Sequence, residues 1–274
     1  MTGGLARSVC MALAGAVAAA FPSPAGEGPA RQMAVDLELV LAVDVSMSMM
    51  AEELAIQRNG YAAALADPGV TAAILGGPRG RIALTYVEWS GVNEQAVVIP
   101  WTVIASLEDV RAVGERLVGA PAYRSFRTSV SGALEFAASL FDGNGIEGEA
   151  RVIDISGDGA NNEGLPVAQA RDAIVARGVT INGLPLMTEF GLISSFDVPD
   201  LDDYYAECVI GGPGAFSEPV ENWEQFAAAV RRKLVREITR APQTAARVEP
   251  AAAREGYDCL IGEKLWNRQQ GIGQ

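Results

Sequence analysis

Hydrophobic and polar positions along the chain alternate between short apolar runs and longer segments with helical spacing. Residues 37–43 form a near-continuous apolar run, which is typical of a strand buried on both faces of a sheet. Residues 49–66 follow with apolar positions on one side, which predicts a helix. Asp67 and Pro68 end that helix, because a residue before proline avoids the helical conformation. The pattern therefore opens with a strand that is followed by a helix.

The same alternation continues through most of the chain. Apolar runs predict further strands at 81–89, 96–104, 151–156, 179–185 and 204–210, and helical spacing predicts helices at 107–117, 129–141, 167–177 and 222–238. The short turn at 90–93 predicts a hairpin, and Pro100 places the second strand of that hairpin at a sheet edge. Strands alternating with helices predict an α/β fold, a doubly wound and mostly parallel sheet with one antiparallel edge strand and helices on both faces.

The N-terminal 25 residues have the pattern of a secretory signal peptide. Arg7 precedes an Ala-rich apolar run at 9–21, and small residues that suit cleavage follow it. The run is too short to span a bilayer, which takes about 20 apolar residues. The alternative is a disordered Ala-rich N-terminus. We therefore expect a periplasmic or secreted protein with no membrane span after signal cleavage.

Charge and composition narrow the classes of function. The formal net charge is −13, and loss of Arg7 with the signal peptide would make the mature chain more acidic. Such a chain is a poor ligand for nucleic acid and for anionic membranes, whereas it favours cations. The chain contains no histidine, which excludes Ser-His-Asp and Cys-His nucleophile systems and any imidazole base.

Two cysteines, Cys208 and Cys259, remain after signal cleavage. In an exported protein such a pair predicts a disulfide, and the alternative is two unrelated buried thiols. We expect one domain at 35–240 and a C-terminal extension at 241–274, which the disulfide would tether to the domain.

Oxygen-bearing side chains lie at predicted strand ends or helix starts at three places. Asp44, Ser46 and Ser48 follow the first strand, Asp158 follows the strand at 151–156, and Thr128 precedes the helix at 129–141. Each has an ordinary alternative, because Ser and Thr cap helices and Asp-Gly forms turns. Together they are expected at one edge of the sheet, where α/β proteins bind ligands. Oxygen ligands without nitrogen or sulfur suit Mg²⁺, Mn²⁺ or Ca²⁺.

The spacing Asp44-x-Ser46-x-Ser48, followed by Thr128 and Asp158, resembles the metal-ion-dependent adhesion site (MIDAS) of von Willebrand factor type A domains. The resemblance covers 35–240. The segments DVSMSM, ISGDGANNEG and ECVIGGPGAF resemble more closely an exported bacterial group of this fold whose function is unassigned.

The resemblance implies how the site would work. In that family the serines and the threonine bind the metal through neutral hydroxyls, and the aspartates act largely through waters. An open coordination position accepts a carboxylate of the partner. The resemblance therefore implies a binding module rather than an enzyme, with a protein or peptide partner that offers Asp or Glu.

Three residues beside the predicted ligands are candidates for the partner-binding rim. Arg127, together with Arg124, would orient an incoming carboxylate, and Asn161 and Asn162 would shape the mouth of the site. The alternatives are solvated loop arginines and an ordinary turn at NNEG. Asp154, in the middle of a predicted strand, is either a hydrogen-bonded carboxylate that supports the rim or a sign that the strand boundaries are wrong.

Two other functions remain open. One is a metal-dependent hydrolase, with Ser46 or a metal-bound water as nucleophile. The missing histidine, the missing second carboxylate cluster and the missing phosphate-binding loop argue against it. The other is a regulatory subunit of a larger envelope complex, since this fold also serves in metal-chelatase and ATPase complexes.

Overall fold

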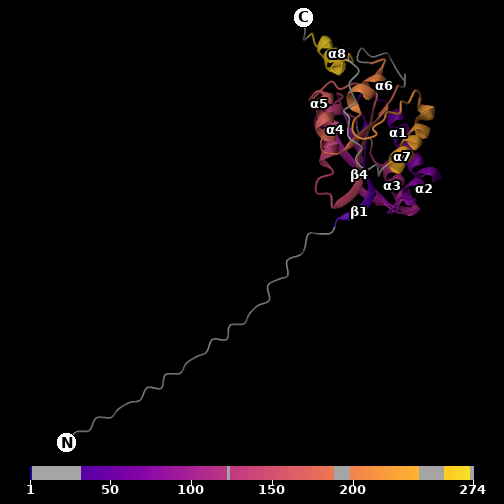
Figure 1. The fold of residues 1–274 in the computed structure, drawn as a ribbon. Coiled ribbons are helices and arrows are strands. Elements are labelled where there is room, and N and C mark those ends of the chain that lie inside the picture. The colour runs from indigo at the N-terminus through magenta and orange to yellow at the C-terminus, as the bar shows by residue number, and fades with distance from the viewer. Residues whose placement is uncertain (2–31, 122–123, 188–197, 241–255, 272–274) are drawn as a thin grey trace. The chain divides into compact units, whose positions relative to one another are not determined.

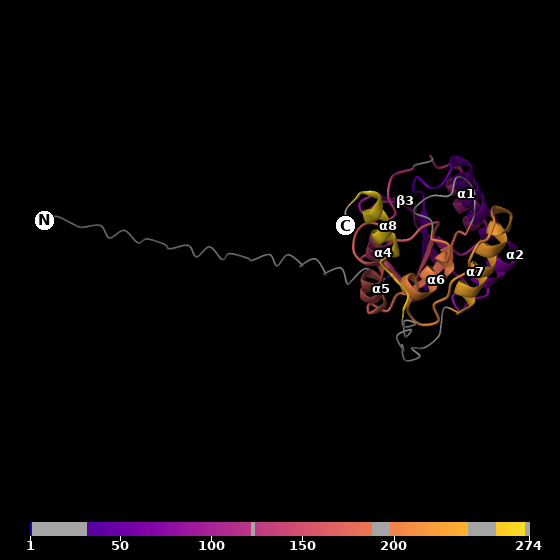
Figure 2. The same cartoon turned by 90° about the horizontal axis from the view of Figure 1, so that it is seen from above.

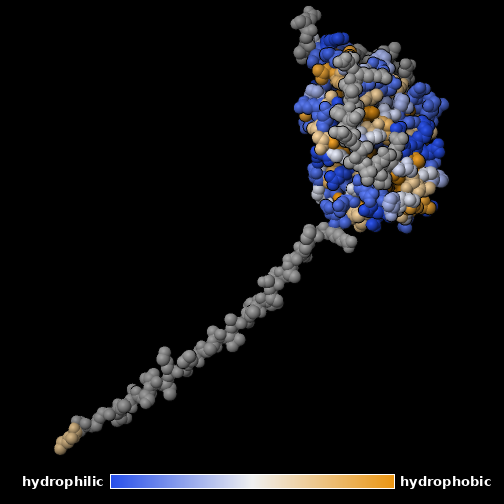
Figure 3. All heavy atoms as spheres, viewed as in Figure 1, coloured by the Kyte–Doolittle hydropathy of each residue, from blue (hydrophilic) through white to orange (hydrophobic). Residues whose placement is uncertain are grey.

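The computed structural model describes residue 1 and residues 32–121, 124–187, 198–240 and 256–271. Apart from Met1, the predicted signal peptide lies outside the described residues, and so do residues 241–255 of the C-terminal extension. Residues 32–274 group as one compact unit. The face in Figure 3 is mostly hydrophilic, as expected of a surface in contact with water.

A five-stranded sheet forms the centre of this unit, in the order β3-β2-β1-β4-β5. The strands are β1 (Met33–Asp44), β2 (Ile82–Trp89), β3 (Gln95–Ile104), β4 (Ile146–Gly157) and β5 (Thr180–Pro185). All neighbouring pairs are parallel except the pair of β2 with the edge strand β3, which is antiparallel. The predicted fold class, a mostly parallel sheet with one antiparallel edge strand, is confirmed.

Strand β1 lies in the middle of the sheet, because both of its faces are apolar. Leu37, Leu39 and Leu41 point into one hydrophobic core, and Val40 and Ala42 point into the other. Alternate residues of a strand face opposite sides, so one apolar run contributes to both layers.

Helices cover both faces of the sheet (Figures 1 and 2). On one face lie α1 (Ala51–Leu65), α2 (Pro68–Leu75), α3 (Leu107–Gly119) and α7 (Phe226–Arg240), which follows the 3₁₀ turn Trp223–Gln225. On the other face lie α4 (Val130–Ser139), α5 (Val167–Val175), α6 (Leu201–Tyr204), the π-helical turn Tyr205–Val209 and α8 (Ile261–Gln269). No helix in the described part of the chain is long and apolar enough to cross a membrane.

The strand predicted at 204–210 is wrong, since the chain there forms α6 and the π-helical turn. Its buried residues are Tyr204, Tyr205, Cys208 and Val209, and positions one turn apart share a helical face. A short apolar run does not distinguish a buried strand from a buried helix.

Helix α1 ends where Asp67 and Pro68 predict, but a second helix begins at once. The Asp67 side chain accepts a hydrogen bond from the Gly69 backbone at 2.7 Å and caps α2, whose first residue is Pro68. Proline suits the first position of a helix, since its missing N–H has no partner there anyway. The same two residues therefore end one helix and start the next.

Candidate metal site

The carboxyl end of β1 carries the first predicted ligand, Asp44. Its side chain is fully buried, and its Oδ1 accepts a hydrogen bond from the Ser46 backbone at 2.7 Å. Its Oδ2 has no hydrogen-bond partner among the described residues. This oxygen faces Gly157 at the end of β4, where an added Cβ would lie 2.9 Å from it. A glycine is therefore needed at 157 for the two strand ends to approach each other.

A chain of oxygen atoms connects the loop after β1 to the loop after β4. The hydroxyls of Ser46 and Ser48 lie 2.8 Å apart, and the Ser48 hydroxyl donates to Asp158 Oδ1, also at 2.8 Å. Ser46 is buried, whereas Ser48 is exposed. Four of the five predicted ligands therefore converge at one edge of the sheet.

Thr128, the fifth predicted ligand, reaches the same edge from the loop before α4. An added Cβ on Gly159 would lie 3.8 Å from the Thr128 hydroxyl oxygen, so Thr128 lies beside the Asp158 loop. Asn162 fixes this approach, since its Oδ1 accepts from the Thr128 backbone at 3.1 Å and its own backbone donates to the Thr128 carbonyl at 2.8 Å. Asn162 thus positions a predicted ligand through the backbone.

Asn161 does not lie on the surface rim. Its side chain is fully buried, its Oδ1 accepts from the Ser131 backbone at 3.0 Å, and its Nδ2 donates to Glu263 at 2.7 Å. The assignment of Asn161 to the partner-binding rim is therefore corrected, because a side chain enclosed between α4 and α8 does not meet a partner.

Arg127 has a left-handed backbone, with φ of 73°. Its guanidinium lies over the ring of Trp266 in α8, 3.6 Å from the ring centre, and 3.4 Å from Glu163. Residues other than glycine rarely adopt this backbone conformation. The contacts with Trp266 and Glu163 therefore help to hold Arg127 in place next to Thr128. Arg124 instead donates to the Met47 carbonyl at 2.9 Å, which joins the two serine- and threonine-bearing loops.

Electrostatics at the site favour a cation. Burial raises the pKa of the Asp44 carboxyl well above its usual range, and the negative charge of Asp158 raises this pKa further. A buried carboxylate with a second carboxylate close by gains free energy when a divalent cation neutralises the pair. The Oδ2 of Asp44, which has no hydrogen-bond partner among the described residues, and the surrounding hydroxyls also fit the preference of Mg²⁺, Mn²⁺ and Ca²⁺ for oxygen ligands.

The composition of the site differs from common protein metal centres. The described residues contain no group of three or more His, Cys, Asp or Glu that could hold a metal ion. The candidate set contains two carboxylates, and its other members are hydroxyls. A metal there would depend on neutral ligands and on an anionic oxygen supplied from outside.

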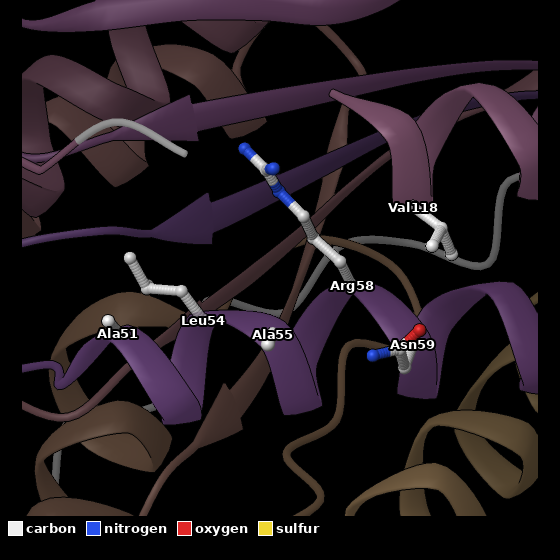
Figure 4. Close-up of a pocket in the computed structure, with 6 residues that line it drawn as sticks. All are labelled: Ala51, Leu54, Ala55, Arg58, Asn59 and Val118. Carbon is white, nitrogen blue, oxygen red and sulfur yellow. The ribbon is translucent and has the colours of Figure 1, made fainter. Parts of the chain in front are cut away.

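A small pocket of roughly 110 Å³ lies between α1 and α3, close to the start of α1. Figure 4 shows Leu54, Arg58 and Asn59 on α1 and Val118 on α3 around it. The Arg58 guanidinium donates two hydrogen bonds to the Glu88 carboxylate, from Nε at 2.8 Å and from Nη2 at 2.9 Å. None of the five predicted metal ligands lines this pocket, and it is smaller than the roughly 300–1,000 Å³ typical of organic-ligand sites.

Asp154 lies inside β4, so the predicted strand there is confirmed. Its carboxylate pairs with Lys233 of α7 at 2.8 Å and therefore faces the helix layer, away from the rim. Sequence reasoning missed this lysine, which looks like one more basic residue in the helix.

Sequence reasoning also missed three residues that lie beside the predicted ligands or their loops, Tyr205, Glu263 and Trp266. Burial raises the pKa of the Tyr205 hydroxyl, and the nearby Asp44 raises it further. An added Cβ on Gly157 would lie 2.9 Å from the Tyr205 hydroxyl as well as from Asp44, so both oxygens face the same glycine. Sequence reasoning assigned Tyr205 to a strand and gave α8 no structure, which left no signal for these contacts.

The predicted disulfide between Cys208 and Cys259 is present, with Cα atoms 5.5 Å apart. It joins the π-helical turn to the segment that leads into α8. The C-terminal extension is therefore tethered to the domain close to the loop that carries Asp158, a predicted ligand.

Solved structures of similar fold show what this architecture resembles. The pilus adhesin SpaC from Lactobacillus rhamnosus GG has a TM-score of 0.56 and 11% identity, over 78% of this chain and 32% of that one. Proximal thread matrix protein 1 from the mussel byssus, with a zinc-occupied MIDAS motif, has a TM-score of 0.51 and 13% identity, over 76% of this chain and 47% of that one. A von Willebrand factor type A protein from Catenulispora acidiphila has a TM-score of 0.50 and 14% identity, over 74% of this chain and 43% of that one. The chain spans less than half the length of each.

No curated protein sequence matches the chain. A family model described as "Protein of unknown function (DUF1194)" matches residues 34–242, which include all five predicted metal ligands. The chain therefore belongs to the DUF1194 family and has the fold of a von Willebrand factor type A domain.

Proposed function

We propose that the protein is an exported, divalent-metal-dependent binding module that engages a carboxylate of a protein or peptide partner. Asp44, Ser46, Ser48, Thr128 and Asp158 would hold the metal, with Mg²⁺ as the preferred ion and Mn²⁺ or Ca²⁺ as alternatives. When bound, the ion supplies an electrophilic centre that attracts an anionic oxygen.

The observation that carries this proposal is the chain of oxygens at the edge of the sheet. Ser46, Ser48 and Asp158 are linked at 2.8 Å, and the buried Asp44 next to them keeps one oxygen without a partner in the described structure. A buried carboxylate oxygen without a partner is costly, so a native structure that keeps one calls for an explanation. A cation with its bound water explains it, and the resemblance to the adhesion site points to the same explanation.

Exposed apolar side chains beside the predicted ligands favour a macromolecular partner. Met47, Met50 and Phe126 are 45%, 37% and 72% exposed, and all three lie in the two loops that bring Ser46, Ser48 and Thr128 together. The loops are joined by a bridge between Ser46 and Ser125. A small free anion would gain little from these side chains, whereas a protein surface would cover them.

The names of two similar structures agree with this proposal. One is a pilus adhesin, and the other is a thread matrix protein with a zinc-occupied MIDAS motif. Export is supported by the N-terminal sequence pattern and by the disulfide, a bond that persists in oxidising compartments.

The hydrolase alternative keeps one supporting observation, because the Ser46 hydroxyl is linked through Ser48 to a carboxylate. A hydroxyl next to a carboxylate still lacks the strong general base that serine nucleophiles use. A panel of ester and phosphate-ester substrates would decide between the two functions. Turnover by wild-type protein that disappears in Ser46→Ala would replace the binding module with an enzyme.

The test of the proposed function is capture of a partner from the native envelope fraction, with immobilised mature protein in Mg²⁺ or in EDTA. We expect a partner that is retained only in Mg²⁺ and lost with Thr128→Ala. Ser139→Ala is the matched control, because it removes one hydroxyl from the far end of α4.

The partner itself supplies the second half of the test. Replacing one specific Asp or Glu of the partner by its amide should abolish binding. A partner that binds equally well in EDTA, or whose contacts avoid the edge with Asp44 and Asp158, would overturn the proposal.

A further inference from the structure

Helix α8 lies outside the residues that match the family model, yet it contacts two of the three loops that carry predicted metal ligands, those of Thr128 and Asp158. In Figure 1 it lies, in yellow, at the end of the molecule opposite the start of β1. That end is where the carboxyl ends of the parallel strands, and thus Asp44 and Asp158, are found.

The first contact is with the loop that follows Asp158. Gly262 packs directly on this loop, since an added Cβ would lie 2.1 Å from the Asn161 carbonyl oxygen. The carboxylate of Glu263 accepts from Asn161 Nδ2 at 2.7 Å, and the Asn161 Oδ1 accepts from the Ser131 backbone. Asn161 therefore links α8 to α4 through the loop that carries Asp158.

The second contact is with the loop that carries Thr128. Trp266 presents its ring to the guanidinium of Arg127 at 3.6 Å, and Arg127 immediately precedes Thr128. The left-handed backbone of Arg127 costs free energy and needs support from its surroundings. Trp266 supplies part of that support.

A tether holds α8 in this place. Cys259, two residues before the helix, is bonded to Cys208, and the Tyr257 hydroxyl donates to the Asp200 carbonyl at 3.3 Å. The Tyr257 ring lies beside that of Tyr204, whose hydroxyl accepts from the Asn161 backbone at 3.0 Å. The tether and the helix thus meet at the same loop.

We infer that α8 is a second layer of the metal site, with Glu263 and Trp266 as positioning residues that hold the Asp158 and Thr128 loops in the geometry that binds metal. This inference rests on the proposed metal site. Residues behind the ligands of a metal commonly change its affinity by about 10–100-fold when they are replaced. Metal affinity should therefore depend on a helix that touches no metal.

The experiment is a calorimetric titration of Mn²⁺ into the full mature chain. Glu263→Ala and Trp266→Ala should each weaken Mn²⁺ binding by about 10-fold. Glu263→Gln keeps an oxygen that accepts from Asn161, and Trp266→Phe keeps an aromatic face for Arg127, so both should bind close to wild type. Lys264→Ala is the matched control on the same helix, because within the described residues Lys264 makes an exposed ion pair with Asp258 and none with the two loops.

Thermal unfolding in EDTA, measured for each variant, separates metal affinity from a general loss of stability. Glu263→Ala also keeps the test valid if Trp266→Ala does not fold, since a half-buried polar side chain is replaced. Wild-type affinity in folded Glu263→Ala would overturn the role of α8 and leave the proposed function intact. A wild-type chain that binds no Mn²⁺ would overturn both.

Discussion

Two fully buried carboxylates on neighbouring strands have opposite surroundings. Asp154 of β4 pairs across the sheet with Leu41 of β1, three residues before Asp44. Asp154 meets the ammonium of Lys233 at 2.8 Å, whereas the charged group that acts most on Asp44 is another carboxylate, Asp158. The fold supplies its own cation where the carboxylate is structural. At the rim, carboxylate and hydroxyl oxygens lie together, and under the proposed function a bound metal ion would supply the cation.

The buried group of Asp154, Lys233 and Glu237 contains one carboxylate more than its lysine neutralises. Lys233 also pairs with Glu237 at 2.5 Å, and Glu237 accepts from Asn182 at 2.8 Å. Burial raises the pKa of Asp154 to about 7, with Lys233 opposing this shift and Glu237 adding to it. With a proton on Asp154 this group would be neutral, and the rim would reach neutrality by binding a metal.

The largest expected effect comes from removing the internal cation. Lys233→Met leaves Asp154 and Glu237 buried without a counterion, which should lower the free energy of unfolding by about 3–5 kcal/mol. Denaturant unfolding in EDTA measures this loss. Lys264→Met, on an exposed ion pair, is the matched control and should stay within about 0.5 kcal/mol of wild type. Equal effects of the two lysine substitutions would show that Asp154 and Glu237 do not need Lys233 as a buried counterion.

A second prediction concerns the external cation. Mn²⁺ at about 100 times its Kd should raise the free energy of unfolding of wild type by about 2.7 kcal/mol, because it binds only the folded state. Asp44→Asn should lose this increment without losing stability in EDTA, since the amide removes a buried charge. Asp154→Asn should keep the increment. Thermal unfolding with and without Mn²⁺ checks both, and an increment that survives in Asp44→Asn would place the metal elsewhere.

The smallest expected effect is a dependence on pH. The pKa of Asp154 is about 7 in the folded state and about 3.9 in an unfolded chain. Between these values the folded state holds the extra proton, so stability falls as pH rises and levels off above about 7. From pH 6 to 7 the loss should be about 1 kcal/mol relative to Asp154→Asn. Unfolding of both proteins in EDTA from pH 5 to 8 measures the difference, and a constant difference would contradict the assignment.

Much of the fold could be predicted because the relevant signals are local. The apolar run at 37–43 makes β1 a central strand whichever helices cover it, and Pro100 marks the edge strand β3. The oxygens at Asp44, Ser46 and Ser48 are close in sequence, and Asp158 follows a strand whose end a parallel sheet must bring beside them, whereas Thr128 precedes a helix.

The remaining parts depend on contacts between segments that are distant in sequence. Asp154 forms an ion pair with Lys233, 79 residues later in the chain, and no sequence pattern links the two. Residues 201–209 are helical and buried in the core, and α8 packs on the loops at 127 and 161, contacts that the local sequence does not show. Asn161 looked like a surface turn residue because α8, which covers it, had not been assigned a position.

We propose above all that the rim formed by Asp44, Ser46, Ser48, Thr128 and Asp158 binds one divalent cation. Calorimetric titration of Mn²⁺ into mature wild-type protein, beside the double variant Asp44→Ala, Asp158→Ala, tests this most directly. We predict one site in wild type and no binding in the double variant, with both proteins folded by circular dichroism. Wild-type affinity in the double variant, or no binding by wild type, would contradict it.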